Sequence, residues 1–181
     1  DVDDRGFVVV DENQRSCRPH IWALGDVCSP WMLKHVANFE ARAVRHNLLH
    51  PDDLTCAEHD VVPAAVFGHP QIATVGATEE QLKATGTDYV VKVQLYADVA
   101  YGWAMEVQHH AVKALGEPGT GRVLGAHLMG PQASTLIQPI VQMMTLGTDT
   151  TEMVRRQYWI HPALTEVVEN ALLGMLQEAR G

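Results

Sequence analysis

A polar stretch near residues 51–60 divides the sequence into two parts whose hydrophobic patterns differ. Before it, a short apolar run at residues 21–24 stops at a Gly-Asp pair, and helical periodicity follows from His35 to about Leu49. After it, short β-branched runs alternate with turn residues, and two helical patterns follow them. Strands grouped with two packing helices indicate an α+β domain, so the polar stretch is the predicted domain boundary.

The part after the boundary contains strand and helix candidates in a definite order. A helix should begin after Thr78, because Thr78 and Gln81 have the spacing of a capping box. The glycine-rich loop at residues 116–121 lacks the order of a phosphate-binding loop and does not precede a helix, so it predicts a hairpin turn. The expected strands cover residues 61–67, 72–75, 89–95, 110–115 and 123–129, and the expected helices cover residues 78–85, 133–146 and the segment after Pro162.

The part before the boundary predicts a hairpin strand at residues 7–10 and a buried strand at residues 21–24, of the kind found in parallel sheets. At the end of the second run, Gly25 places the Asp26 carboxylate where it can accept hydrogen bonds from the hydroxyls of a ligand. On the pentapeptide at residues 23–27 alone, an ordinary turn aspartate is the simpler interpretation.

The composition argues against several function classes. The net charge is −9 and the 13 basic residues are scattered, which argues against nucleic-acid binding, because phosphate binding requires clustered Lys and Arg. No apolar run approaches the roughly 20 residues of a membrane helix. Neither the histidines nor the cysteines have the spacing of a zinc site, so no bound metal is expected. The three cysteines form no close pair, which favours a reducing cytoplasm over a secreted disulfide framework.

The segment from His161 to Glu166 carries the elements of an acid–base pair. Pro162 fixes the backbone directly after His161, and Glu166 lies in the first turn of the expected helix, where the helix dipole favours a carboxylate. A carboxylate that accepts from one ring nitrogen leaves the other nitrogen able to exchange a proton with a substrate. A His and a Glu at this spacing also occur by chance, so the pair alone does not establish catalysis.

Taken in order along the chain, these motifs resemble the pyridine nucleotide–disulfide oxidoreductases over essentially the whole sequence. Residues 23–27 resemble the family's second flavin motif, whose aspartate holds the ribityl chain of FAD, and residues 32–37 resemble the segment that lies against the isoalloxazine ring. Residues 63–76 and 121–127 resemble the opening and the central hairpin of the dimerisation domain. The implied flavin contacts are Gly25, Asp26, Met32, Leu33, Lys34, His35 and Ala37.

The resemblance implies a two-part architecture. Residues 56–181 would form the dimerisation domain of a flavoprotein disulfide reductase, an α+β fold with an antiparallel sheet and packing helices. Residues 1–55 would be the last strands and helix of an FAD-binding α/β domain. Two residues depart from common family patterns: Ala163 replaces a threonine, and Lys34 replaces a smaller residue.

The resemblance also implies a mechanism in which NADPH reduces FAD, the flavin reduces a cysteine pair, and a thiolate attacks a low-molecular-weight disulfide. His161 would protonate the departing thiol and Glu166 would fix the ring tautomer, at a site assembled across a homodimer. Residues 98–106 and 157–164 resemble the members that reduce mycothiol disulfide. A dihydrolipoamide dehydrogenase and a dimerisation module without chemistry of its own are the alternatives.

Three parts of the family pattern are not found in this sequence. They are the GxGxxG loop for the FAD pyrophosphate, the redox-active CxxxxC pair and the NADPH domain. Cys17, Cys28 and Cys56 do not have the spacing of the redox pair. By itself, the chain is therefore expected not to reduce disulfides and to bind FAD weakly or not at all.

Overall fold

The computed structural model describes residues 1–181, which divide into two compact units, Asp1–Asp60 and Val61–Gly181. The sequence predicts a boundary between residues 55 and 56, whereas the units divide after Asp60. Hydrogen bonds explain the difference. Asn47 holds the main chain of Thr55 at both its N–H and its carbonyl, and His59 bonds to a side chain of the same unit.

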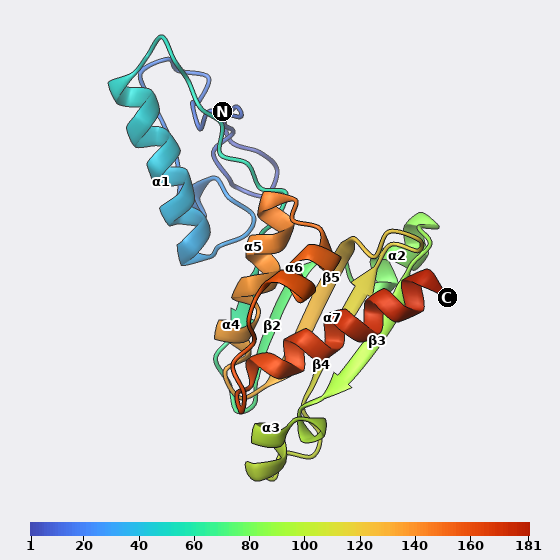
Figure 1. The fold of residues 1–181 in the computed structure, drawn as a ribbon. Helices are drawn as coiled ribbons and strands as arrows, with labels where there is room; N and C mark the ends of the chain where they lie inside the picture. Colours follow the sequence, from blue (N-terminus) through green and yellow to red (C-terminus); the bar gives the residue numbers. More distant parts are fainter. The chain divides into compact units, whose positions relative to one another are not determined.

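The first unit contains one long helix, α1 (Lys34–Leu49), which confirms the predicted helix, and a short 3-10 turn, η1 (Gly25–Val27) (Figure 1). The strands expected at residues 7–10 and 21–24 are absent. Only isolated bridges form there, such as Val10 with Ser16 and Arg15 with Trp22. A strand requires a neighbour that continues the ladder of hydrogen bonds. Here the chain turns back after each single pair, so the β-branched sequence remains loop.

The second unit is built on a five-stranded antiparallel sheet, as the sequence predicts. The strand order is β1-β2-β5-β4-β3, so the first and third strands of the sequence form the two edges. The strands are β1 (Ala64–Val66), β2 (Gln71–Gly76), β3 (Val90–Leu95), β4 (Ala111–Gly116) and β5 (Val123–Gly130). The glycine-rich loop between β4 and β5 is the predicted hairpin turn.

Glycine is required in that turn for a steric reason. Gly121 has a φ of +72°, and a Cβ added to it would lie 2.4 Å from a methyl carbon of Leu176. The close approach lets the C-terminal helix pass directly over the end of the hairpin. A phosphate cradle is not needed to explain this glycine.

The helices follow the sequence patterns with two differences. The capping box of α2 (Glu79–Thr85) is present between Thr78 and Gln81. The helix expected at residues 133–146 is divided into α4 (Ala133–Leu136) and α5 (Gln138–Leu146), because Pro139 has no N–H to donate to the preceding turn. The helices not predicted are α3 (Ala100–Ala104) and α6 (Thr150–Arg156), and a short 3-10 turn, η2 (Tyr96–Asp98), precedes α3.

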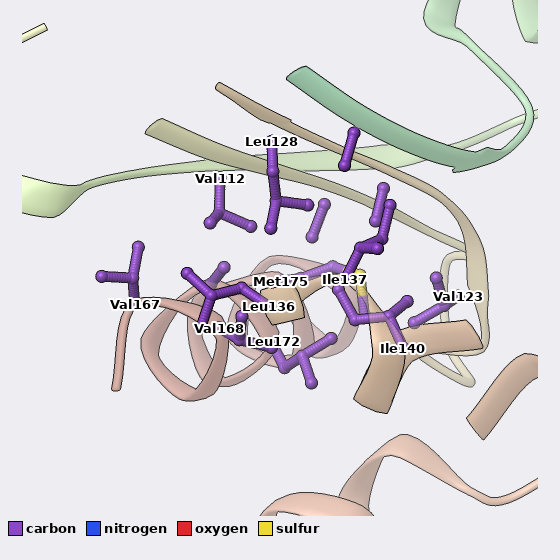
Figure 2. Close-up of a cluster of buried hydrophobic side chains, with 14 of the residues drawn as sticks. Val112, Val123, Leu128, Leu136, Ile137, Ile140, Val167, Val168, Leu172 and Met175 are labelled. Atoms are coloured by element: carbon purple, nitrogen blue, oxygen red, sulfur yellow. The ribbon is translucent and has the colours of Figure 1, made fainter. Parts of the chain in front are cut away.

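The core of the second unit lies between the sheet and the C-terminal helix α7 (Thr165–Arg180), which packs on β3 and β4. Figure 2 shows Leu172 and Met175 of this helix in one cluster with Val112 and Leu128 of the sheet. All four side chains are buried. None of the helices in the chain is both long and apolar enough to cross a membrane.

Truncation of Leu172 to alanine should destabilise the second unit by about 2–5 kcal/mol, because a fully buried leucine leaves a cavity in a packed core. The adjacent Leu173 is 38% exposed, and its truncation should cost about 1 kcal/mol or less. Urea denaturation of the two variants measures the difference. Equal losses of stability would contradict the assignment of this helix face to the core.

Candidate active site

His161 and Glu166 form a direct hydrogen bond, with 2.7 Å between Nδ1 of the imidazole and Oε1 of the carboxylate. The peptide bond between His161 and Pro162 is cis, and Glu166 lies in the first turn of α7. Trp159 and Leu164 pack against the core on either side of the histidine, so both ends of this loop are anchored. The structure therefore brings together the two residues that the sequence predicts.

The two members of the pair differ in their exposure. The Glu166 side chain is 17% exposed, whereas the His161 side chain is 67% exposed. The second carboxylate oxygen of Glu166 accepts a hydrogen bond of 3.0 Å from the Ala163 N–H. The hydrogen bond from His161, and next the one from Ala163, lower the pKa of Glu166 below its ordinary value. Glu166 is thus held as a carboxylate in a fixed position.

This geometry assigns a role to each ring nitrogen of His161. A carboxylate can only accept, so Nδ1 carries the hydrogen that it donates to Glu166. Nε2 has no hydrogen-bond partner within the chain and lies on an exposed side chain. The free nitrogen can therefore give a proton to, or take one from, a group that approaches from outside.

A cavity of about 440 Å³ adjoins the same loop. Its wall includes Pro162 and Thr165 from the loop and α7, together with Tyr101 of α3 and Gln138 of α5. The hydroxyl of Thr165 is buried without a hydrogen-bond partner. No spacing rule in the sequence places these residues together, because they come from three separate helices and a loop.

The flavin motif predicted from the sequence lies in the first unit. Gly25 is buried and has a φ of +70°, and a Cβ added to it would lie 3.2 Å from Cβ of Ala37. The neighbouring Asp26 is exposed, and its carboxylate makes no hydrogen bond or ion pair within the chain. Gly25 and Ala37 therefore lie close together, and the Asp26 carboxylate has no partner within the chain.

The remaining predicted flavin contacts surround the start of α1. Met32 is exposed with a φ of +45°, and Leu33 occupies the N-cap without a side-chain cap. Lys34 and His35 are exposed in the first turn, and Lys34 Nζ donates to Asn38 Oδ1 at 2.7 Å. Uncapped N–H groups at a helix start suit an electronegative group of a ligand. These residues fit one edge of a flavin site.

Sequence reasoning missed a buried carboxylate in the first unit. Glu40 of α1 is 1% exposed and bonds to both Gly25 and His59. The available signal was its position, because Glu40 is four residues from both Val36 and Val44 on the apolar face of the helix. Burial, and next the charge of Glu40, raises the pKa of the Cys28 thiol to about 11, so Cys28 is not a thiolate at neutral pH.

Comparison with known proteins places this geometry in a family context. Residues 62–172 match the family described as pyridine nucleotide-disulphide oxidoreductase, dimerisation domain. The chain is 59% identical to mycothione reductase of Mycobacterium tuberculosis over 97% of the chain and 39% of that protein. It is 37% identical to dihydrolipoyl dehydrogenase of Haloferax volcanii over 99% of the chain and 37% of that protein.

Comparison with solved structures also finds a flavoprotein disulfide reductase. The flavoprotein disulfide reductase RclA of Escherichia coli superimposes with a TM-score of 0.85 at 28% identity, covering 96% of this chain and 40% of that one. The chain thus spans about two fifths of the length of the relatives that it matches.

The lowered pKa of Glu166 predicts how stability depends on pH. Because the folded-state pKa lies below the ordinary value of 4.5, the stabilisation is complete above about pH 4.5 and is lost as the pH falls through the lowered pKa. Glu166→Gln should therefore reduce the unfolding free energy at neutral pH, by about 1 kcal/mol or less since His161 is exposed, and the difference should vanish in acid. Urea denaturation across this pH range measures it.

Glu178→Gln is the matched control, because Glu178 is an exposed carboxylate on the same helix. Its stability difference from the wild type should show no such dependence. A Glu166→Gln difference that is constant with pH would contradict the bond to an ionised Glu166.

Proposed function

The chain belongs to the pyridine nucleotide-disulphide oxidoreductase dimerisation-domain family, and we propose that it is part of an NADPH-dependent flavoprotein that reduces a low-molecular-weight disulfide. In that enzyme the chain contributes the acid–base pair and the dimer interface. The observation that carries this proposal is the hydrogen bond between His161 Nδ1 and Glu166. It leaves the exposed Nε2 ready for proton transfer.

His161 acts on the sulfur that leaves. A thiolate from a redox cysteine pair outside this chain attacks one sulfur of the disulfide, so one S–S bond forms and the original one breaks. Nε2 of His161 takes the proton of the attacking cysteine thiol as its thiolate forms, and it then gives that proton to the departing thiolate, which leaves as a thiol. Glu166 keeps the ring oriented throughout and stabilises it while it is protonated. Apart from the proton on Nε2, neither His161 nor Glu166 forms or breaks a covalent bond during this step.

The flavin would be held in part by residues of the first unit. Gly25 and Asp26 would contact the ribityl side, and the segment that begins α1, with Met32, Leu33, Lys34, His35 and Ala37, would face the ring. FAD, when bound, supplies the electron transfer between NADPH and the redox disulfide. The exposed Asp26 carboxylate supports this assignment, since it is free to accept hydrogen bonds from ligand hydroxyls.

Mycothiol disulfide is the proposed substrate, in a cytoplasmic homodimer in which each His161 serves the disulfide of the other subunit. The identity of 59% to a mycothione reductase supports this choice over lipoamide, since the dihydrolipoyl dehydrogenase of H. volcanii is 37% identical. Nothing in the charge pattern supports a nucleic-acid partner.

Replacement of His161 by glutamine in the full-length protein should lower disulfide turnover by about 10²-fold or more, because the leaving thiolate loses its proton donor. Reduction of the flavin by NADPH should be unaffected, since His161 acts after that step. Steady-state assays and stopped-flow flavin absorbance measure the two steps separately.

His69→Gln is the matched control, because His69 is also exposed and also precedes a cis proline. It should retain wild-type turnover. If His161→Gln also retained wild-type turnover, the catalytic role would be wrong, and a dimerisation module without chemistry of its own would be the better description.

The substrate is tested by assaying the same full-length protein with mycothiol disulfide and with lipoamide. The kcat/KM for mycothiol disulfide should be greater by about 10²-fold or more, as expected when a site is built to hydrogen-bond one substrate and not the other. Higher kcat/KM with lipoamide would assign the protein to the dihydrolipoamide dehydrogenases.

A further inference from the structure

Glu40 is a carboxylate buried inside the first unit, on the face of α1 that also buries Val36 and Val44. An ionised carboxylate is costly to bury unless hydrogen bonds replace the water that it loses. The side chain is 1% exposed, so its partners within the chain must supply those bonds. Glu40 belongs to the first unit and the acid–base pair to the second, so Glu40 is not a member of that pair.

Two partners satisfy Glu40, and they come from distant parts of the unit. The N–H of Gly25 donates to Oε2 at 2.6 Å, and Nε2 of His59 lies 2.9 Å from Oε1. Both oxygens are therefore engaged. Because a carboxylate only accepts, His59 donates from Nε2 to the carboxylate oxygen that Gly25 does not contact.

The bond to Gly25 acts on the turn that carries Asp26. Gly25 has a φ of +70°, and a Cβ added to it would lie 3.2 Å from Cβ of Ala37 of α1. The turn is thus held by the hydrogen bond that Gly25 donates to Glu40, and Ala37 limits the space beside it. Asp26 is the next residue, so the direction of its exposed carboxylate depends on how firmly Gly25 is held.

We propose that Glu40, oriented by His59, is a positioning residue that fixes the Gly25 turn so that Asp26 can hold the flavin. This rests on the proposed function, in which Asp26 contacts the ribityl chain. Glu40 does not touch the flavin. Glu40 reduces the conformational freedom of the Gly25 turn before the flavin binds. This raises the affinity for the flavin without adding a contact to it.

The test is FAD affinity in the full-length protein, measured by fluorescence titration of the apoprotein at a temperature where each variant is folded by circular dichroism. Glu40→Ala should weaken FAD binding by about tenfold or more, since it removes a charge-assisted hydrogen bond and frees the turn. Glu40→Gln retains a carbonyl acceptor for Gly25 and should restore part of the loss. Glu58→Ala is the control, because Glu58 is exposed and lies next to His59 in the sequence.

The outcomes separate the inference from the function on which it rests. Wild-type affinity in Glu40→Ala, together with weakened binding in Asp26→Ala, overturns the positioning role and leaves the flavin site intact. Unchanged affinity in both variants overturns the flavin site itself.

Amide hydrogen exchange of Gly25 in the present chain gives a readout that does not need FAD. Exchange should be faster in Glu40→Ala than in Glu58→Ala, because the Gly25 N–H loses its acceptor. Equal exchange rates would show that Glu40 does not hold the turn, and would overturn the inference whatever the flavin affinity.

Discussion

The burial of α7 against the sheet determines where the acid–base pair can lie. Val167 and Val168 are fully buried at the start of this helix, and Glu166 directly precedes them. The carboxylate is therefore fixed by the same packing that closes the core, and it cannot move without disturbing the sheet. Its hydrogen bond then sets the direction of the exposed His161 ring. The hydrophobic core therefore fixes the position of Glu166, and Glu166 in turn fixes the orientation of the His161 imidazole.

This arrangement separates two requirements of proton transfer to a leaving thiolate. The group that exchanges the proton must meet the substrate, and the group that orients it must not move. His161 is exposed and Glu166 is largely buried, so each side chain satisfies one requirement. The first unit repeats the arrangement with other residues: the buried Glu40 holds a turn whose neighbouring Asp26 is exposed. In both places a shielded carboxylate orients a group that faces outward.

The sequence predicts those parts of the fold that local patterns decide. The five strands and the capping box of α2 were predictable, because alternation and capping are properties of neighbouring residues. The expected strands at residues 7–10 and 21–24 are wrong because a strand depends on partners that local sequence does not reveal. Helix α6 was predictable from Asp149 as its N-cap and Glu152 in its first turn. The pair at His161 and Glu166 was predictable from its motif, whereas the contact of Glu40 with His59 joins residues 19 apart that no motif connects.

The orientation of the His161 ring can be measured directly in this chain from the ¹⁵N chemical shifts of its two ring nitrogens. If Glu166 holds the ring as the structure shows, the neutral imidazole carries its hydrogen on Nδ1, the tautomer that free histidine disfavours. In Glu166→Gln this preference should weaken, because the amide is a poorer acceptor than a carboxylate. A neutral ring that carries its hydrogen on Nε2 in the wild-type chain would contradict the pair, since Nδ1 would then have no hydrogen to donate to the Glu166 carboxylate.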